Sequence, residues 1–531
     1  MTRARQAILT ALIVAALVAP AVAGAQPDAT APAPDRATVL HVLQRLTYGP
    51  RPGDVERVQA LGLAAWLERQ LEPARIDDAA AERALAPLPT LTMSIEDLHR
   101  EYPRADAPQN FAPGASAAPD RSRRPVRIAG ELQASRMVRA VRTERQLQEV
   151  MVDFWANHFN VFVGKGELRW YTTAWEREVI RPHALGRFPD LLRASARHPA
   201  MLFYLDNWLS ARPDYTLPFG PNAGRRSGLN ENYARELMEL HTLGVDGGYT
   251  QKDVTEVARA FTGWTIDRVR VEAHFVFRPA MHDRGEKVVL GHVLRRGGER
   301  DGEDVLELLA RHPATARFIA TKLVRRFVAD DPPPALVERV AAVYRDTGGD
   351  VRAMLRAIAA APEFLAPPAA GVKIKKPTEL VASAARAVGA TVNARGGLAL
   401  ARAAAEIGEG FYEAQAPTGH PDRAEAWVSP GALLARLNFA LALVENRLPG
   451  VRVNAAGLVD GVDRRDPNAV LERLLATLLH GRAGAATRDV LTAQLAAPVI
   501  TRLTAEDRGP ADTDVAKVAA LVLGSPEFQR R

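Results

Sequence analysis

Acidic and histidine side chains concentrate in residues 229–267, which read LNENYARELMELHTLGVDGGYTQKDVTEVARAFTGWTID. Glu236, Glu239, His241 and Glu256 lie within this stretch. Carboxylates and imidazoles act as general acid and base, or bind a hard cation, when the fold brings them together. These four side chains are therefore candidate catalytic residues, in a site that could hold a divalent metal of unknown identity.

Arginines in the same stretch allow a structural interpretation instead. Arg235 and Arg259 each lie three or four residues from a glutamate, so ion pairs within and between helices could neutralise the carboxylates. Glu236 and Glu239 lie five and two residues before His241, and neither interval is the Glu-x-x-His spacing of di-iron helix bundles. The spacing leaves a catalytic site and an ion-pair network as alternatives.

Two further groups could bind a ligand. His282, Asp283 and Lys287 fall near an expected hairpin tip, where binding residues are often found. Asn157 and His158 end an aromatic-rich helix and could line a pocket. The structural alternatives are that Asp283 organises a turn through its own backbone and that His158 is a hydrogen-bonded core residue.

Three lysines gather in residues 372–379, in a chain whose basic residues are mostly arginine. They are Lys373, Lys375 and Lys376, directly before a helix expected to start near Pro377. Lysines at the N-terminus of a helix could bind an anion. The alternative is the solvated end of a linker.

Helices are the elements that must position most of these residues. Apolar residues at intervals of three and four predict helices over residues 37–46, 55–71, 132–162, 171–192 and 231–243. Thr250 with Asp253 resembles a capping box that would start the next helix, and Gly263-Trp264 would close it. Residues 103–125 and 210–228 have the composition of long surface loops rich in proline.

One segment changes to the two-residue period of a strand. Residues 269–278 alternate apolar with polar side chains, and residues 287–294 form a second extended run after a turn at 281–286. We expect one β-hairpin. The predicted fold is therefore mainly α, a multi-helix globular domain with one small β-hairpin and long Pro-rich loops.

The N-terminus has the layout of a secretory signal peptide. Two arginines precede an apolar run over residues 7–19, and Ala23-Gly24-Ala25 offers a cleavage site after Ala25. The run is too short to span a bilayer, so we expect no transmembrane segment after cleavage and a periplasmic or secreted protein. The expected organisation is signal peptide 1–25, Pro/Ala-rich leader 26–36 and helical domain 37–531, with a possible sub-boundary near 366–371.

The amino-acid composition excludes several classes of functional site. The chain has 531 residues, no cysteine and a net charge of +7 spread along its length. Disulfides, thiolate catalysis and iron–sulfur clusters are therefore excluded, and no nucleic-acid groove is expected. The sequence also lacks a Gly-x-Ser-x-Gly elbow, a phosphate loop, a dinucleotide fingerprint and a His-Glu-x-x-His motif.

Several sequence blocks together resemble an exported bacterial family, domain of unknown function 1800. They are HVLQRLTYGPRPGDVERVQALGLAAWLERQL, FWANHFNV, RPHALGRFPDLLRASARHPAMLFYLDN, NENYARELMELHTLGVDGGYTQKDVTEVARAFTGWT, FRPAMHDRGEKVVLG, KIKKPTELV, PTGHPDRAEAWVSPGALLARLNFA and LVLGSPEFQ. The resemblance implies a largely helical exported protein. Genes of that family commonly neighbour those of domain of unknown function 1501, a family similar to alkaline phosphatases and sulfatases, which suggests a partner. His420 replaces an aromatic residue that relatives often carry, so a pocket wall there would be more polar.

Two functional hypotheses follow. One is an exported accessory or binding protein that works with the alkaline-phosphatase/sulfatase-like partner. The alternative is an exported metal-assisted hydrolase that uses the Glu, His and Asp residues named above. The hydrolase requires those side chains to converge in one pocket, whereas the accessory protein should pair its carboxylates with Arg235 and Arg259 and expose an apolar patch. A structural role in the cell envelope is a third possibility.

Overall fold

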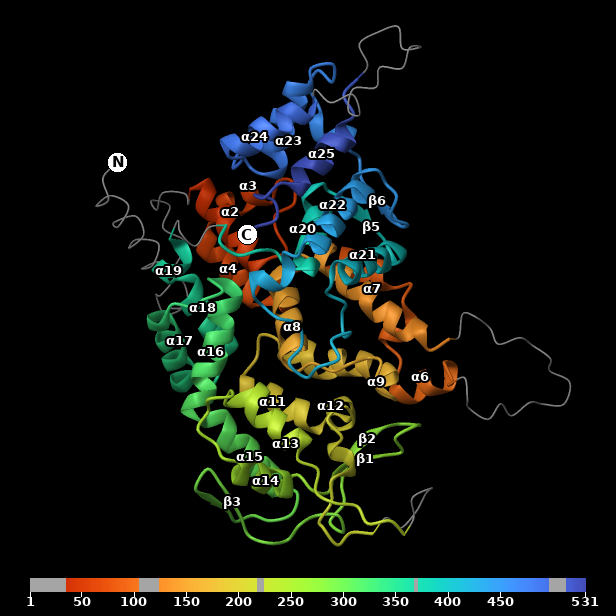
Figure 1. The fold of residues 1–531 in the computed structure, drawn as a ribbon, viewed down its shortest axis with the longest axis vertical. Coiled ribbons are helices and arrows are strands. Elements are labelled where there is room, and N and C mark those ends of the chain that lie inside the picture. The colour runs from red at the N-terminus through yellow and green to blue at the C-terminus, as the bar shows by residue number, and fades with distance from the viewer. Residues whose placement is uncertain (1–34, 105–123, 217–223, 367–370, 496–511) are drawn as a thin grey trace, which may run out of the picture.

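The computed structural model describes residues 35–104, 124–216, 224–366, 371–495 and 512–531. Its helices pack around one continuous hydrophobic core that runs from Val39 to Phe528 (Figure 1). The prediction of a mainly α fold is confirmed. The signal peptide, nearly all of the leader and the centres of both predicted Pro-rich loops lie outside the described residues, as does most of the possible sub-boundary.

The first helices follow the predicted pattern with one break. Gly62 interrupts the helix expected over 55–71, because its backbone has φ +86°, a conformation that glycine adopts without strain. The elements here are α2 (Arg36–Leu46), α3 (Asp54–Leu61), α4 (Leu63–Leu71), α5 (Ala79–Leu85) and α6 (Ile95–Glu101).

The two long central helices that we predicted are also divided. Thr143 adopts an extended conformation that ends α7, and a π-helical turn, η4 (Glu176–Ile180), follows α9. The central elements are α7 (Val126–Arg142), α8 (Gln146–His158), α9 (Leu168–Trp175), α10 (Arg181–His183), α11 (Phe188–Arg197) and α12 (Pro199–Tyr204).

The helix predicted over 231–243 changes its winding halfway. α13 (Asn232–Glu236) is α-helical, and η6 (Leu237–Thr242) is π-helical. A π turn has more residues than an α turn, so it rotates the side chains that follow it relative to those before it. α14 (Gln251–Ala260) begins at the predicted capping box, in which Thr250 and Asp253 bond each other's backbone N–H groups.

Strand pairing differs from the single predicted hairpin. β1 (Trp264–Asp267) pairs with β2 (His274–Phe277), whereas β3 (Lys287–Val289) pairs with β4 (His292–Leu294). A third pair, β5 (Thr391–Val392) with β6 (Val451–Arg452), joins distant parts of the chain. The prediction was wrong because Trp264, expected to close a helix, instead begins the strand that takes β2 as its partner.

The second half of the chain is helical again. Its elements are α15 (Arg300–Arg311), α16 (Pro313–Phe327), α17 (Pro334–Thr347), α18 (Val351–Ala359), α19 (Pro362–Leu365), α20 (Pro377–Ala387), α21 (Ala394–Ile407), α22 (Pro430–Val444), α23 (Pro467–Leu478), α24 (Ala485–Leu495) and α25 (Val515–Gly524).

The ends of the elongated molecule are formed by different segments (Figure 1). α23 to α25 lie at one end, and α14, α15 and the short β3 lie at the other. The final residues return to the centre, where Arg530 forms an isolated bridge with Ile374 beside the start of α20. None of the helices in the described ranges is long and apolar enough to cross a membrane.

Candidate functional site

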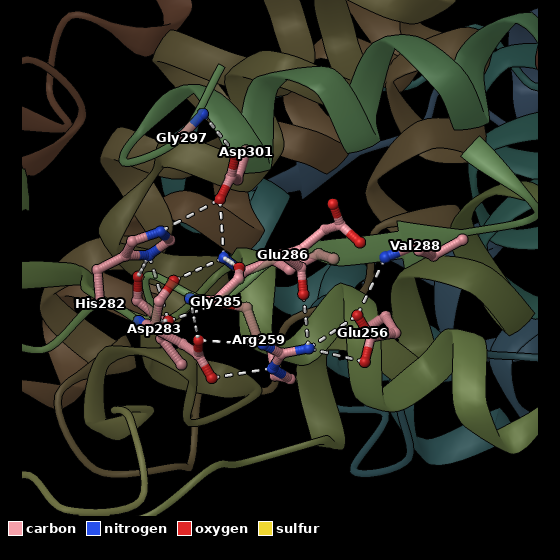
Figure 2. Close-up of polar contacts among 11 residues, drawn as sticks. Glu256, Arg259, His282, Asp283, Gly285, Glu286, Val288, Gly297 and Asp301 are labelled. Carbon is pink, nitrogen blue, oxygen red and sulfur yellow. Dashed lines mark hydrogen bonds and ion pairs between the residues drawn. The ribbon is translucent and has the colours of Figure 1, made fainter. Parts of the chain in front are cut away.

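Arg259 of α14 holds the loop that precedes β3 (Figure 2). Its Nε and Nη2 donate to the two carboxylate oxygens of Asp283 at 2.9 and 3.1 Å, and its Nη1 donates to Glu256 at 2.8 and 2.9 Å. Glu256 also accepts the backbone N–H of Val288 at 3.1 Å. The hydrogen bonds from Arg259 lower the pKa of Asp283, which favours its ionised carboxylate beside the guanidinium.

A second, buried part of this network joins the same loop to α15. Asp301 accepts from Lys287 Nζ at 2.9 Å and lies 3.3 Å from His282 Nε2. His282 Nδ1 lies 2.8 Å from the carbonyl oxygen of Thr262, which can only accept. Burial alone would raise the pKa of Asp301, but the hydrogen bonds from His282 and Lys287 lower it. Both ring nitrogens of His282 are therefore engaged within the protein.

An open cavity of about 700 Å³ lies beside this network. His282 and Asp301 contribute to its wall, together with Arg284, Glu286 and Arg295. The wall carries both signs of charge, so the cavity could accept a small polar ligand.

Glu236 and Glu239 lie apart from that network. Both are half-buried, and the pKa of Glu236 is raised by burial and by the neighbouring charge of Glu239. Arg235 pairs with Glu231 at 3.3 Å and bonds Gln251 at 3.0 Å. Arginine therefore pairs with Glu256 and Asp283, as expected for the carboxylates near Arg259. Arg235 forms its ion pair with Glu231 and not with Glu236 or Glu239.

His241 and His158 form a third group, in the core. The π turn of η6 turns His241 inward, where its carbonyl oxygen lies 3.1 Å from His158 Nε2. Lys322 Nζ, from α16, lies 2.9 Å from His158 Nδ1. Burial lowers the pKa of His241 to about 3 and that of Lys322 to about 8. A neutral His158 satisfies this geometry, with Nε2–H donating and Nδ1 accepting.

The sequence did not single out Lys322. It lies 164 residues after His158, and no local spacing links the two. A buried amine whose pKa is lowered is a feature of reactive lysines, but here its nearest polar partner is the histidine ring.

Asn157 positions a loop instead of facing open solvent. Its amide exchanges two hydrogen bonds with the backbone of His420, at 2.8 and 2.7 Å. Gly419 has φ +69°, and an added Cβ there would lie 2.5 Å from the Asn157 carbonyl oxygen. Asn157 and His420 line a cavity of about 30 Å³, so His420 forms part of a small pocket wall.

The nine predicted site residues thus fall in four places. Glu256, His282, Asp283 and Lys287 come together around the β3 loop. Glu236 with Glu239, His158 with His241, and Asn157 form the other three groups. Within the described ranges, no group of three or more His, Cys, Asp or Glu side chains is arranged to hold a metal ion.

These observations define a helical protein with short strand pairs and no single pocket that gathers the predicted residues. The family described as protein of unknown function (DUF1800) matches residues 41–530, and the chain belongs to this family. The resemblance noted from the sequence blocks is confirmed. No curated protein and no solved structure matches the chain.

Proposed function

We propose that the protein is an exported accessory protein that binds an alkaline-phosphatase- or sulfatase-like partner through one face of α22. The observation that carries this proposal is the apolar surface of that helix. Leu433, Leu434 and Leu437 are 43%, 60% and 46% exposed, and Val428, just before the helix, is 40% exposed. Arg436 is the one charged residue of α22, and it is buried.

This face has the form of a docking surface. Arg436 turns inward, where it donates to Gln529 at 2.9 Å and to the Lys375 carbonyl oxygen at 2.8 Å, so no charge interrupts the exposed leucines. Contiguous exposed apolar surface is unusual on a protein that acts alone and commonly marks a binding site. Leucines at positions i, i+1 and i+4 on one helix can enter an apolar groove of a partner.

The remaining parts of the proposal rest on the sequence. Export is supported by the signal-peptide pattern of residues 1–25. The nature of the partner is supported by the family resemblance. The pairing of Arg259 with Glu256 and Asp283 agrees with a structural role for those carboxylates.

A binding measurement with a charged substitution tests the proposal. Leu434→Lys places an ammonium on the face, and we expect it to weaken binding to the purified neighbouring phosphatase-like protein by at least tenfold, because an unpaired charge would be buried in the interface. Val490→Lys on α24 is the matched control, since Val490 is 61% exposed. Equal affinity of both variants and the unchanged protein would overturn the proposed surface.

A metal-assisted hydrolase is a second candidate, favoured by the Glu236–Glu239 pair. A carboxyl whose pKa is raised beside a second carboxyl is a common arrangement for general acid catalysis. Metal analysis of protein purified without chelator tests it by inductively coupled plasma mass spectrometry. This candidate requires near-stoichiometric metal that Glu236→Gln loses and that the control Glu231→Gln retains. A folded protein without metal would exclude a resident metal in this role.

A further inference from the structure

The three lysines before α20 are buried, so the alternative of a solvated linker end was wrong. Lys373 Nζ donates to the Arg325 carbonyl oxygen at 2.8 Å and to Asp330 at 2.5 Å. Lys376 Nζ lies 2.7 Å from Glu409 and 3.3 Å from Asp153. Two of the three ammonium groups therefore have carboxylate partners.

Lys375 differs from both neighbours. It is 5% exposed, yet within the described part of the chain its Nζ has no hydrogen bond and no carboxylate within 4 Å. Its Nζ lies over the ring of Phe528, 3.8 Å from the ring centroid. Its backbone is fixed on both sides, because its N–H donates to the Gln529 carbonyl oxygen at 2.9 Å and its own carbonyl oxygen accepts from Arg436.

The side chain lines a small cavity of about 20 Å³ between α2, α20 and the segment that follows α23. The polar residues of its wall are Gln44, Ser383, His480 and Arg482 besides Lys375, and the wall contains no carboxylate. One water-sized sphere needs about 10–15 Å³ by this measure, so the cavity has room for one small ion. The Gln44 amide oxygen is buried without a hydrogen bond, and rotation of that amide would present its NH₂ group instead.

The surroundings of the cavity are also positive. Burial and the nearby Arg482 lower the pKa of His480 to about 4 and that of Lys375 well below its ordinary value. Glu379 is the acidic group that acts on Lys375, but Arg326 and Arg531 already pair with it. Glu527 acts on Arg482 from outside the cavity wall, so the charge that lacks a carboxylate partner among the described residues is that of Lys375.

We propose that this cavity binds one halide-sized monovalent anion, with Lys375, Arg482 and the turned Gln44 amide as its donors. A buried ammonium without a counter-charge is unfavourable, and an anion at this position supplies the missing charge. The bound ion connects α2 and α20 with the C-terminal residues Arg482 and Phe528. The cavity wall contains no residue of α22, and the proposed site requires no partner protein.

Chloride is the probe that tests the site. The purified full chain is unfolded thermally in sodium chloride and in sodium gluconate of equal ionic strength. We expect chloride to raise the Tm in a saturable manner and bromide to replace it. Lys375→Met should abolish the chloride-specific rise, whereas the control Lys252→Met, at an exposed lysine of α14, should retain it.

Direct binding keeps the proposal falsifiable if Lys375→Met fails to fold. With the unchanged protein, the line broadening of the chloride-35 NMR signal should saturate as chloride is added. The chloride affinity obtained in this way should be at least tenfold weaker for Arg482→Met. Bromide-soaked crystals should show anomalous density beside Lys375 Nζ. No chloride-specific rise in Tm, an equal rise in Lys375→Met, or a neutral Lys375 amine in saturating chloride would each overturn the site.

Discussion

Lys287 and Lys375 are 1% and 5% exposed, yet they lie in opposite electrostatic surroundings. Lys287 donates to Asp301 and to two backbone carbonyl oxygens of the loop it supports. Lys375 faces a cavity whose wall adds Arg482 and no carboxylate. The Lys287 ammonium is neutralised by a carboxylate of the protein. The Lys375 ammonium has no such partner in the cavity wall, so its counter-charge would have to be an anion bound from solution.

The difference separates two uses of a buried charge. In the network before β3, Arg259 pairs with Glu256 and Asp283, and Lys287 pairs with Asp301, so these charges fix the position of the loop. At the Lys375 cavity the donors outnumber the acceptors, which is the condition for binding an anion. A buried charged side chain therefore indicates a ligand site only where the protein supplies no partner of opposite charge.

The largest expected effect is loss of the β3 network through Asp301→Ala. Lys287 would remain buried without a carboxylate, and breaking a buried pair in this way costs about 3–5 kcal/mol. Urea unfolding measures the free energy. Asp267→Ala, at a more exposed pair with Arg278, should cost less than about 1 kcal/mol. A similar cost for both variants would mean that burial of the β3 network adds nothing to its stability.

One substitution with opposite results in the two regions is the sharpest comparison. Lys287→Met should lower the free energy of unfolding by about 2–3 kcal/mol, because Asp301 loses its ammonium partner. Lys375→Met should raise it by about 1–2 kcal/mol in low chloride, because a charge whose burial lowers its pKa is removed. Both values come from urea unfolding at pH 7.5. Destabilisation by both substitutions would contradict the contrast.

Acid should weaken the Lys375 region through His480. Its pKa is about 4 when folded against 6.5 ordinarily, so the unfolded chain takes up the proton first as the pH falls. Stability from this group is complete above about pH 6.5 and declines toward pH 4. Between pH 7 and pH 5 the loss is about 1 kcal/mol after allowance for partial exposure.

His480→Gln tests this prediction. The variant and the unchanged protein should lose different amounts of stability between pH 7 and pH 5, with the smaller loss in the variant. Measurement at pH 8, where the histidine is neutral in both states, gives the effect of the substitution that does not depend on titration. Parallel pH curves for the two proteins would refute the role of His480.

Local signals in the sequence gave correct local structure. The Thr250–Asp253 capping box depends on residues three apart, and the structure has it as predicted. The helix expected over 231–243 was placed correctly, but a π turn is not encoded by apolar spacing. His241 is buried, whereas Glu236 and Glu239 are half-buried, as residues two and five apart on a helix do not share a face.

Long-range partners could not be predicted in the same way. The anion hypothesis for the KIKKP segment could not choose among its lysines, because the side-chain partners of Lys373 and Lys376 lie 33 to 223 residues away in sequence. The pairing of β1 with β2 was missed because only β2 lies within the alternating segment. Which of the three lysines lacks a carboxylate partner can be seen only in the folded structure.

The smallest expected effect concerns the geometry of Arg259. Arg259→Lys keeps the charge but loses the planar fork that contacts Asp283, Glu256 and the Glu286 carbonyl oxygen together (Figure 2). We expect a global loss of about 0.5–1 kcal/mol, because the side chain is partly exposed. The loop should open locally more often, which hydrogen exchange at Gly285 and Val288 would detect. Arg235→Lys, at a more exposed pair, should leave that exchange unchanged. Equal exchange in Arg259→Lys and the unchanged protein would show that a positive charge alone is enough to hold the loop.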